Sequence, residues 1–179
     1  MGSVTPKGRV SFPHVFEKHS GIEGGEPKFS VNLVFDTEAQ KSPLYKEMQE
    51  AVKKAAHEKF GEKLPKNFRS PFRDGEEKGF TADDVVVAFT SKHKPGVVNT
   101  KLQNLEDDGT VYAGGYGRVE YTVYAYDQAG NKGVAFGFGN FQWTGDGEPL
   151  TQRKSAQEAF ADYAEDDVLD STADDALGF

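Results

Sequence analysis

The sequence has no cysteine and, among its 179 residues, only one tryptophan and two methionines. The lack of cysteine excludes disulfide bonds and thiolate metal sites, which fits a reducing cytoplasm. No stretch approaches the roughly 18 consecutive apolar residues that a membrane span needs. The segment after Met1 also lacks the apolar run of a signal peptide. We therefore expect a soluble cytoplasmic protein with no membrane partner.

Lysine and arginine are absent from residues 155–179, which contain eight acidic side chains. All 21 basic residues lie before residue 155, together with 21 of the 29 acidic residues. The body is therefore neutral, and the tail carries the whole formal charge of −8. A length of about 150 residues suits one domain with one core. We expect one domain over 1–154 and a flexible acidic C-terminal tail over 155–179.

The acidic tail ends in Phe179, two residues after Leu177. One interpretation is a solvated terminus that keeps the protein soluble, because blocks of like charge repel one another and stay disordered. That interpretation leaves the terminal ring unexplained. The other is a tethered mimic of a nucleic-acid strand, in which Asp174 and Asp175 replace phosphates and the ring replaces a base. Such a tail could cover a basic groove on its own body, fill that of a second copy in a homodimer, or bind a partner protein.

Alternation of polar and apolar residues predicts the strands of the body. The predicted segments are 9–12 with 14–17, 28–35, 84–90, 118–126 and 134–143. Pro13 interrupts the first segment, as it would at a sheet edge or a bulge. In the last segment, strict alternation places Phe141 and Trp143 on the face opposite Phe136.

A helix is predicted over 42–60, and both of its ends are marked. Ser42 is a natural N-cap, Pro43 suits the first helical position, and Gly61 lies just past the end. We expect one apolar stripe of the helix to pack on the sheet. The stripe consists of Leu44, Met48, Ala51, Val52 and Ala55.

Two connections complete the predicted body. Residues 63–81 lose the periodicity, and cations alternate there with Phe68 and Phe72, as in a long surface loop of the kind that is usually functional or mobile. Farther on, the turn at Asp107-Asp108-Gly109 lies between Leu102–Leu105 and Val111–Tyr112, which predicts a hairpin.

Five or six strands with one inserted helix indicate a mainly β protein, most simply a small, curved antiparallel barrel. A β-sandwich is the structural alternative. The chain has 14 Phe, 7 Tyr and 1 Trp, more rings than one core of this size needs. Exposed rings next to Lys and Arg are the combination that binds single-stranded nucleic acid, because any base can stack on a ring while the cations follow the backbone.

The predicted groove combines cations for the phosphates with rings for the bases. The cations are Arg9, Lys92, Lys94 and Arg118, and the rings are Tyr116, Tyr124, Phe141 and Trp143. Each has an alternative role, since Phe141 and Trp143 can equally belong to the core and the lysines can be ordinary loop charges. Tyr116 and Arg118 lead the set, because we see no packing purpose for a Gly-Gly-Tyr-Gly-Arg turn.

Catalytic and cofactor sites find little support in the sequence. The paired carboxylates at Asp83-Asp84 and Asp107-Asp108 read as strand-entry and turn residues rather than as ligands of a catalytic metal. The four histidines show no ligand spacing, and no glycine-rich loop leads into Lys-Ser/Thr at a helix start. We expect no metal, no cofactor and no enzymatic activity.

Several fragments, in order along nearly the whole chain, resemble a family of phage-encoded single-stranded DNA-binding proteins. They are Gly8–Phe12, Gly24–Ser30, Pro71–Gly75, Lys94–Val98, Tyr116–Arg118, Gly130–Gly133 and Asp146–Leu150, followed by the acidic tail ending in Phe179. The resemblance implies an OB fold and sequence-tolerant binding of single-stranded DNA in phage replication, recombination and repair, in the cytoplasm of a bacterial host. It also implies that the tail recruits replication or recombination proteins. The alternative is a non-DNA structural or decoy protein that uses its acidic tail to occupy basic partners.

Overall fold

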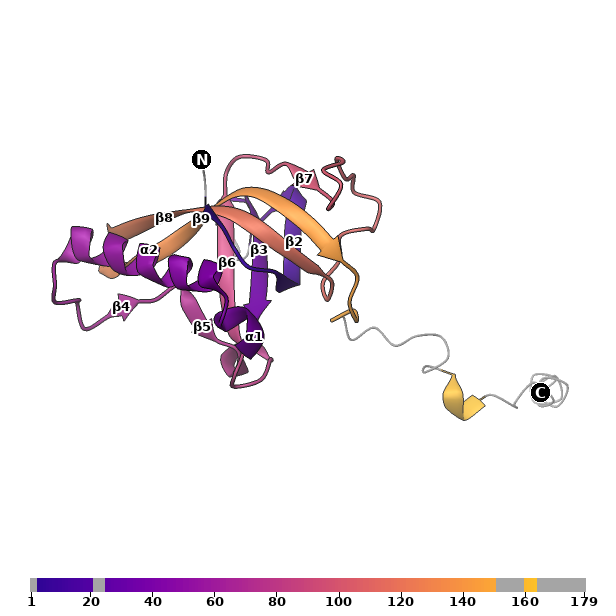
Figure 1. Ribbon diagram of the computed structural model, residues 1–179, viewed down its shortest axis with the longest axis horizontal. Coiled ribbons are helices and arrows are strands. Elements are labelled where there is room, and N and C mark those ends of the chain that lie inside the picture. The colour runs from indigo at the N-terminus through magenta and orange to yellow at the C-terminus, as the bar shows by residue number, and fades with distance from the viewer. Residues whose placement is uncertain (1–2, 21–24, 151–159, 164–179) are drawn as a thin grey trace, which may run out of the picture.

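A computed structural model describes residues 3–20, 25–150 and 160–163 (Figure 1). The body is mainly β, with one long helix lying alongside the sheet. The strands are β1 (Ser3–Val4), β2 (Gly8–His19), β3 (Lys28–Phe35), β4 (Phe68–Arg69), β5 (Phe72–Asp74), β6 (Val85–Ser91), β7 (Val97–Val98), β8 (Tyr116–Gln128) and β9 (Asn131–Gly145). The helices are α1 (Thr37–Gln40), α2 (Pro43–Phe60) and the short 3-10 turns η1 (Glu76–Lys78) and η2 (Ala161–Tyr163).

Five strands pair in a closed circuit. In order around it they are β2, β3, β6, β9 and β8, and β8 pairs again with β2. Two of these seams are short, since β6 meets β9 and β2 meets β8 over two residue pairs each. The circuit agrees with the predicted OB-like barrel, which is a small, partly open one. The prediction of a wholly antiparallel sheet is wrong, because β4, β6 and β7 all run parallel to β9.

The core fills the interior of this circuit and extends under α2. Its largest fully buried side chains include Phe35, Phe89, Phe136 and Phe141. Tyr45 of α2 packs edge-on against Phe35 at a centroid distance of 5.6 Å and lies 5.5 Å from Phe72. These contacts join the helix to the sheet and to β5, so the apolar rings hold three chain segments together.

The helix α2 begins and ends where the sequence predicts. The Ser42 hydroxyl accepts a hydrogen bond from the amide of Leu44 at 3.2 Å, and Pro43 occupies the first turn. Gly61 closes the helix with φ +83°, a left-handed value that favours glycine. The buried stripe is turned slightly from the predicted one, because Leu44 is only half buried. It consists of Tyr45, Met48, Val52 and Ala56.

A bulge in β2 and another in β9 change the side of the sheet to which the following side chains point. In β2, Ser11 pairs with Asn32 and His14 with Ser30, so three steps along β2 match two along β3. In β9, Phe138 pairs with Tyr121 and Phe141 with Val119, which again adds one residue to β9. Because side chains alternate with a period of two, one extra residue moves everything beyond it to the opposite face.

Two connections differ from the sequence expectations. Residues 102–112 form no hairpin: Val111 and Tyr112 lie outside any strand, and Asn104 makes an isolated bridge to Val98 instead. The segment 63–81 has more structure than a surface loop, because it contains β4, β5 and η1. There β5 pairs with the first half of β6, and β4 pairs with the start of β9.

The predicted tail falls mostly outside the described residues. Of the predicted partner-binding residues, Asp174, Asp175, Leu177 and Phe179 all lie outside them, so the division into a domain over 1–154 and a tail remains a prediction. Within 160–163, Phe160 and Tyr163 are largely exposed. No helix in the described ranges is long and apolar enough to cross a membrane.

Candidate nucleic-acid interface

The strands β2, β3 and β6 turn one side of the sheet away from the core. We call this side the outer face and define it by Arg9, His14, His19, Lys28, Ser30, Asn32, Ala88 and Thr90. Cross-strand pairing arranges these residues in rows, since Ser30 lies between His14 and Thr90. The alternate residues of β3 are buried in the core. In an OB fold, the exposed face of the second and third barrel strands, here β3 and β6, binds oligonucleotides.

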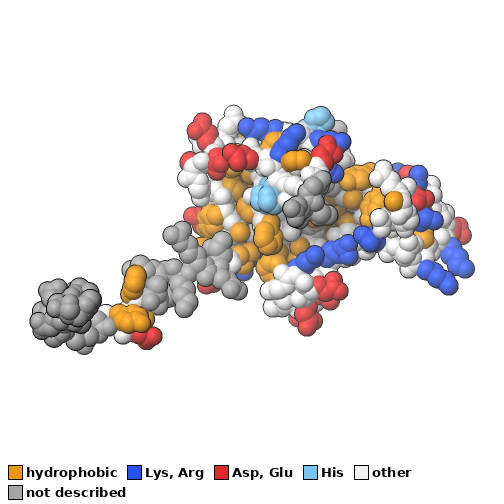
Figure 2. All heavy atoms as spheres, turned by 180° about the vertical axis from the view of Figure 1, so that it is seen from behind, with side chains coloured by type: hydrophobic (Ala, Val, Ile, Leu, Met, Phe, Trp, Pro, Cys, Tyr) orange, Lys and Arg blue, Asp and Glu red, His pale blue; other side chains and the backbone are white. Residues whose placement is uncertain are grey.

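Charge on the outer face is concentrated at its two ends. The middle rows, made by Asn32, Ala88, Ser30 and Thr90, carry no carboxylate. At one end, a cavity of about 430 Å³ is lined by residues that include His19, Lys28, Ser30 and Thr90. Figure 2 shows one side of the body, on which Lys, Arg and His side chains lie among exposed hydrophobic and acidic ones. Each end contains cations together with carboxylates, whereas the polar strip between them is neutral and does not repel a nucleic-acid backbone.

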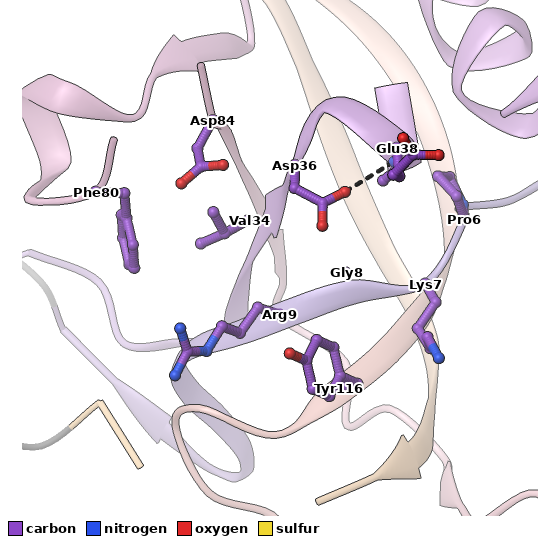
Figure 3. Close-up of a pocket in the computed structure, with 11 residues that line it drawn as sticks. Pro6, Lys7, Gly8, Arg9, Val34, Asp36, Glu38, Phe80, Asp84 and Tyr116 are labelled. Atoms are coloured by element: carbon purple, nitrogen blue, oxygen red, sulfur yellow. Dashed lines mark hydrogen bonds between the residues drawn. The ribbon is translucent and has the colours of Figure 1, made fainter. Parts of the chain in front are cut away.

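The other end of the outer face is a cavity of about 440 Å³ between β2, β8 and the residues before β6. Figure 3 shows Lys7, Arg9 and Tyr116 close together on one side of it and Phe80 on another. The Lys7 ammonium lies 5.6 Å from the centroid of the Tyr116 ring, within cation–π range. The Tyr116 side chain is 37% exposed, so part of its ring remains free to contact a ligand.

Arg9 is held in place by the backbone. Its Nε donates to the carbonyl of Gly114 at 3.2 Å, and its Nη2 donates to that of Glu148 at 2.6 Å. The cavity wall also includes carboxylates, of which Asp36 caps α1 by accepting from the Ala39 amide at 2.8 Å. This end therefore combines a fixed guanidinium, a lysine and a half-exposed ring with acidic neighbours.

Phe12 is the most exposed phenylalanine on the strands. Its side chain is 68% exposed, and its backbone has φ +47° at the bulge of β2. A left-handed conformation is costly for a bulky residue and is usually kept where function requires it. The bulge turns the ring outward between the Ser11–Asn32 and His14–Ser30 pairs, next to the neutral rows. Simple alternation with Val10 would have placed this ring in the core.

Two histidines stack on the same strand. The rings of His14 and His19 lie 4.0 Å apart at an interplanar angle of 8°. Partial burial lowers the pKa of His14, and the nearby charge of His19 lowers that pKa further. The His14 ring is therefore favoured in its neutral form, and the stacked pair offers flat surfaces and ring nitrogens at the Lys28 end of the outer face.

The predicted cations separate into different regions. Arg9 lies at one end of the outer face. At the opposite end, the Lys92 ammonium is 3.4 Å from the carboxylate of Glu26, a residue that lines the cavity next to Lys28. Lys94 lines a different cavity, of about 360 Å³, together with Glu17, Glu106 and Asp107. Arg118 projects from the part of β8 that pairs with β9, opposite Gln142, and its Nε is buried without a hydrogen-bond partner among the described residues.

The predicted stacking rings divide in the same way. Tyr116 lies at the outer face, whereas Tyr124, 45% exposed, lies on the β8–β9 hairpin opposite Ala135. The assignment of Phe141 and Trp143 to a stacking platform is wrong for this structure, because they are only 1% and 6% exposed. The bulge in β9 turns both rings into the core.

The glycines before Tyr116 have a packing purpose that the sequence did not reveal. A Cβ on Gly115 would lie 1.9 Å from the Trp143 ring, and one on Gly114 would lie 2.1 Å from the carbonyl oxygen of Glu148. Gly114 also has φ +116°. The Gly-Gly pair therefore makes room for the buried indole and for the segment after β9, and it also brings Tyr116 beside Arg9.

Sequence reasoning missed most of the central residues of the outer face. The alternation of 28–35 predicts that Lys28, Ser30 and Asn32 lie on a face that meets water or a ligand, but it does not select them for the groove. The alternation of 9–12 predicts that Phe12 lies on the apolar side of its strand. The available signal was Pro13, which marks a bulge and therefore a change of face. Among the described residues, no group of three His, Asp or Glu side chains is arranged to hold a metal ion.

Comparisons with known proteins agree on the type of fold. A family model described as Enterobacter phage Enc34, ssDNA-binding protein, matches residues 1–169. The single-stranded DNA-binding protein from bacteriophage Enc34, solved in complex with ssDNA, superposes with a TM-score of 0.71 at 19% identity, over 83% of this chain and 88% of that one. The crystal structure of gp2.5, the single-stranded DNA-binding protein of bacteriophage T7, gives 0.59 at 16% identity, over 92% and 94%. No curated protein matches the sequence.

Proposed function

Because the chain belongs to the family of the single-stranded DNA-binding protein of Enterobacter phage Enc34, we propose that it binds single-stranded DNA along its outer face, with little dependence on sequence. This family membership confirms the resemblance found in the sequence, and the family is one of binding proteins, not of enzymes. The observation that carries the proposal is the exposed Phe12 ring, held at a strained bulge beside a neutral polar strip with cations at both ends.

The proposed binding mode assigns phosphates to the ends of the face and bases to its rings. Lys7 and Arg9 at one end, and Lys28 and Lys92 at the other, would contact the phosphates, while Phe12 and Tyr116 would stack on bases. From Val34 to Lys28 the face spans six residue steps of β3, about 20 Å at about 3.4 Å per residue. That length suits a short stretch of strand, in keeping with the roughly 4–16 nucleotides that one OB fold covers.

Other predicted residues extend the proposal beyond this face. Arg118 and Tyr124 remain candidates for a longer path of the strand around β8, and Lys94 remains a candidate at the loop after β6. Lys94 is the weakest of these three candidates for a DNA contact, because the carboxylates of Glu17, Glu106 and Asp107 line the same cavity. Phe141 and Trp143 are left out of the binding site because both rings are buried.

We propose that the acidic tail competes with DNA for the outer face and, when DNA displaces it, recruits proteins of phage replication or recombination. The support is the separation of charge, since the neutral body precedes a tail that carries the whole −8. Deleting residues 155–179 should therefore tighten DNA binding, most clearly at low salt, where a polyanion competes best. Equal binding by the truncated and full-length proteins at every salt concentration would argue against masking.

The binding site is tested by titrating the full chain against labelled oligo-dT at several salt concentrations, with fluorescence anisotropy as the readout. Each phosphate neutralised on a single strand contributes about −0.7 to the slope of log K against log salt. Replacing Lys28 with glutamine should flatten the slope by roughly that amount. The matched control is Lys54→Gln on the exposed side of α2, which should leave the slope unchanged.

Three outcomes would contradict the proposal or a part of it. If oligo-dT binds neither the full chain nor the tail-deleted chain at any salt concentration, the chain is not a DNA-binding protein, and the alternative of a structural or decoy protein holds. If oligo-dT binds but Lys28→Gln and Lys54→Gln give the same slope, the DNA lies on another surface. Binding of a DNA duplex of the same length with equal affinity would contradict the preference for single strands.

A further inference from the structure

An apolar cavity lies between α2 and the segment of residues 63–73, away from the outer face. Its volume is about 230 Å³, and its apolar walls are Val52 and Ala56 of α2 with Leu64, Phe68 and Phe72. Phe68 packs edge-on against Phe60 at 6.0 Å, which fixes one wall. Leu64 is 37% exposed at its rim. We call this cavity the α2 cavity; the proposed DNA contacts do not use it.

Basic side chains lie in the walls of the α2 cavity and in the segment that forms one of those walls. Lys53 and His57 of α2 line the cavity. The segment 63–73 contains Lys63, Lys66, Arg69 and Arg73 and no acidic residue. All four are exposed, and none of them forms an ion pair with another described residue. An apolar hollow next to a segment that carries four unpaired cations is complementary to a ligand that has a ring next to carboxylates.

The C-terminus of this chain has that chemistry. It reads Asp174-Asp175-Ala176-Leu177-Gly178-Phe179, so two carboxylates precede two large apolar side chains. An apolar cavity of about 150 Å³ is large enough to hold benzene. The α2 cavity, at about 230 Å³, therefore has room for the ring of Phe179.

The body also provides a route from the start of the tail to this cavity. The chain leaves the body next to Arg9, because Arg9 donates to the carbonyl of Glu148 at 2.6 Å and Leu150 donates to that of Ala113 at 3.0 Å. From Arg9, cross-strand partners run through Val34 and Val86 to Arg73. This row ends at Arg73, one residue after Phe72, and the two side chains point to opposite faces of β5. A chain on the outer face therefore reaches the α2 cavity, which Phe72 lines, by passing around β5, whose pairing among the described strands is with β6.

The distances allow the tail of the same molecule to follow this route. The row crosses from β2 to β5 in three strand spacings of about 4.8 Å, roughly 14 Å in all. Between Leu150 and Leu177 lie 27 residue steps, which can reach up to about 90 Å when extended. The acidic part of the tail can therefore lie over Arg9 and Arg73 with length to spare.

We infer that Leu177 and Phe179 dock in the α2 cavity of their own chain and anchor the acidic tail across the Arg9 end of the outer face. This inference rests on the proposed function, in which the tail competes with DNA, and it names the anchor of that competition. DNA displaces the acidic segment from the outer face while the anchor holds the tail near the body. Loss of the anchor lowers the local concentration of carboxylates over the face and so favours DNA.

The direct test places a spin label in the tail and observes the methyl signals of the cavity by NMR without DNA. Because the sequence has no cysteine, Ala173→Cys gives a single labelling site in the full chain. We expect selective broadening of the methyl signals of Val52, Ala56 and Leu64. The broadening should disappear when Phe179→Ala is added.

Three results would overturn the inference. The first is that the spin label broadens only NMR signals of outer-face residues. The second is that the methyl signals of the α2 cavity stay broadened when Phe179→Ala is added. The third is broadening seen only when labelled and unlabelled chains are mixed, which would assign the cavity to the tail of a second copy. Because no DNA is present, a failure here is distinct from a failure of oligo-dT to bind.

A second measurement uses DNA affinity. Phe179→Ala and Leu64→Ser should each tighten oligo-dT binding several-fold at low salt, and the double variant should equal either single one. Leu102→Ser is the matched control, because Leu102 is a leucine that is 74% exposed on a loop outside the α2 cavity, and it should change nothing. Additive effects of Phe179→Ala and Leu64→Ser would show that the two residues act separately and would contradict docking.

Discussion

Replacing Phe12 with alanine is expected to weaken the binding of single-stranded DNA while leaving the fold intact. The ring is 68% exposed at the bulge of β2, so its removal opens no cavity in the core. Substitutions at such surface sites usually change the free energy of unfolding by less than about 0.5 kcal/mol. Any large loss of DNA affinity would therefore come from the lost ring and not from unfolding.

The size of the effect follows from stacking. One base stacked on an aromatic side chain contributes about 1–3 kcal/mol to binding, as judged by alanine substitution. At about 1.4 kcal/mol per factor of ten, the Kd for oligo-dT should rise roughly 5- to 150-fold. The ring carries no charge, so the slope of log K against log salt should stay the same and the whole line should move to weaker binding.

The assay is fluorescence anisotropy with labelled oligo-dT over a range of salt concentrations, together with urea unfolding of each variant. Leu102→Ala is a closely matched control, because Leu102 is 74% exposed and has φ +63°, another large apolar side chain in a left-handed conformation. Its DNA affinity should equal that of the original chain. If Phe12→Ala binds as tightly as Leu102→Ala at every salt concentration, Phe12 is not a stacking residue and the proposed path of the strand is wrong.

Two further predictions concern packing and pH. Gly115→Ala should lower the free energy of unfolding by about 1–3 kcal/mol, the usual cost of overpacking, because its Cβ would lie 1.9 Å from the Trp143 ring. Gly145→Ala, whose Cβ would meet nothing within 4 Å, is the control in urea unfolding, and equal stabilities would contradict this packing. The pKa of His14 is lowered in the folded state, first by burial and then by His19, so the unfolded chain binds the proton first as the pH falls. The free energy of unfolding should therefore be higher above the ordinary histidine pKa of about 6.5 and decrease below it. His14→Gln should reduce this pH dependence; an unchanged dependence would rule His14 out as its source.

Local signals in the sequence were sufficient for the longer elements, which are β2, β3, β6, β8, β9 and α2, but not for the short ones. The strand Lys28–Phe35 has the predicted bounds, because its alternation is uninterrupted. The helix α2 follows its Ser42 cap, its Pro43 and its terminal glycine, all of which act through neighbouring backbone groups. The hairpin predicted around Asp107-Asp108-Gly109 failed because a turn sequence does not require that its flanks pair.

The candidate binding site depended on long-range pairing that no local pattern contains. Arg9 and Tyr116 are far apart in the sequence, and only the pairing of β2 with β8 makes them neighbours. The same row continues to Arg73 because β5 joins the edge of β6. For this reason the sequence could propose Arg9 and Tyr116 separately, yet it could not distinguish them from Arg118 and Tyr124, which lie where β8 pairs with β9.

The sequence by itself determined the composition of the molecule: a neutral, strand-rich body, one capped helix, and an acidic tail that ends in a ring. The tertiary structure decided which rings face solvent. One extra residue in β2 turns the Phe12 side chain toward solvent, and one extra residue in β9 turns the side chains of Phe141 and Trp143 into the core. The physical reason is that a strand has a period of two, so a bulge reverses its faces, and whether a bulge forms depends on the partner strand.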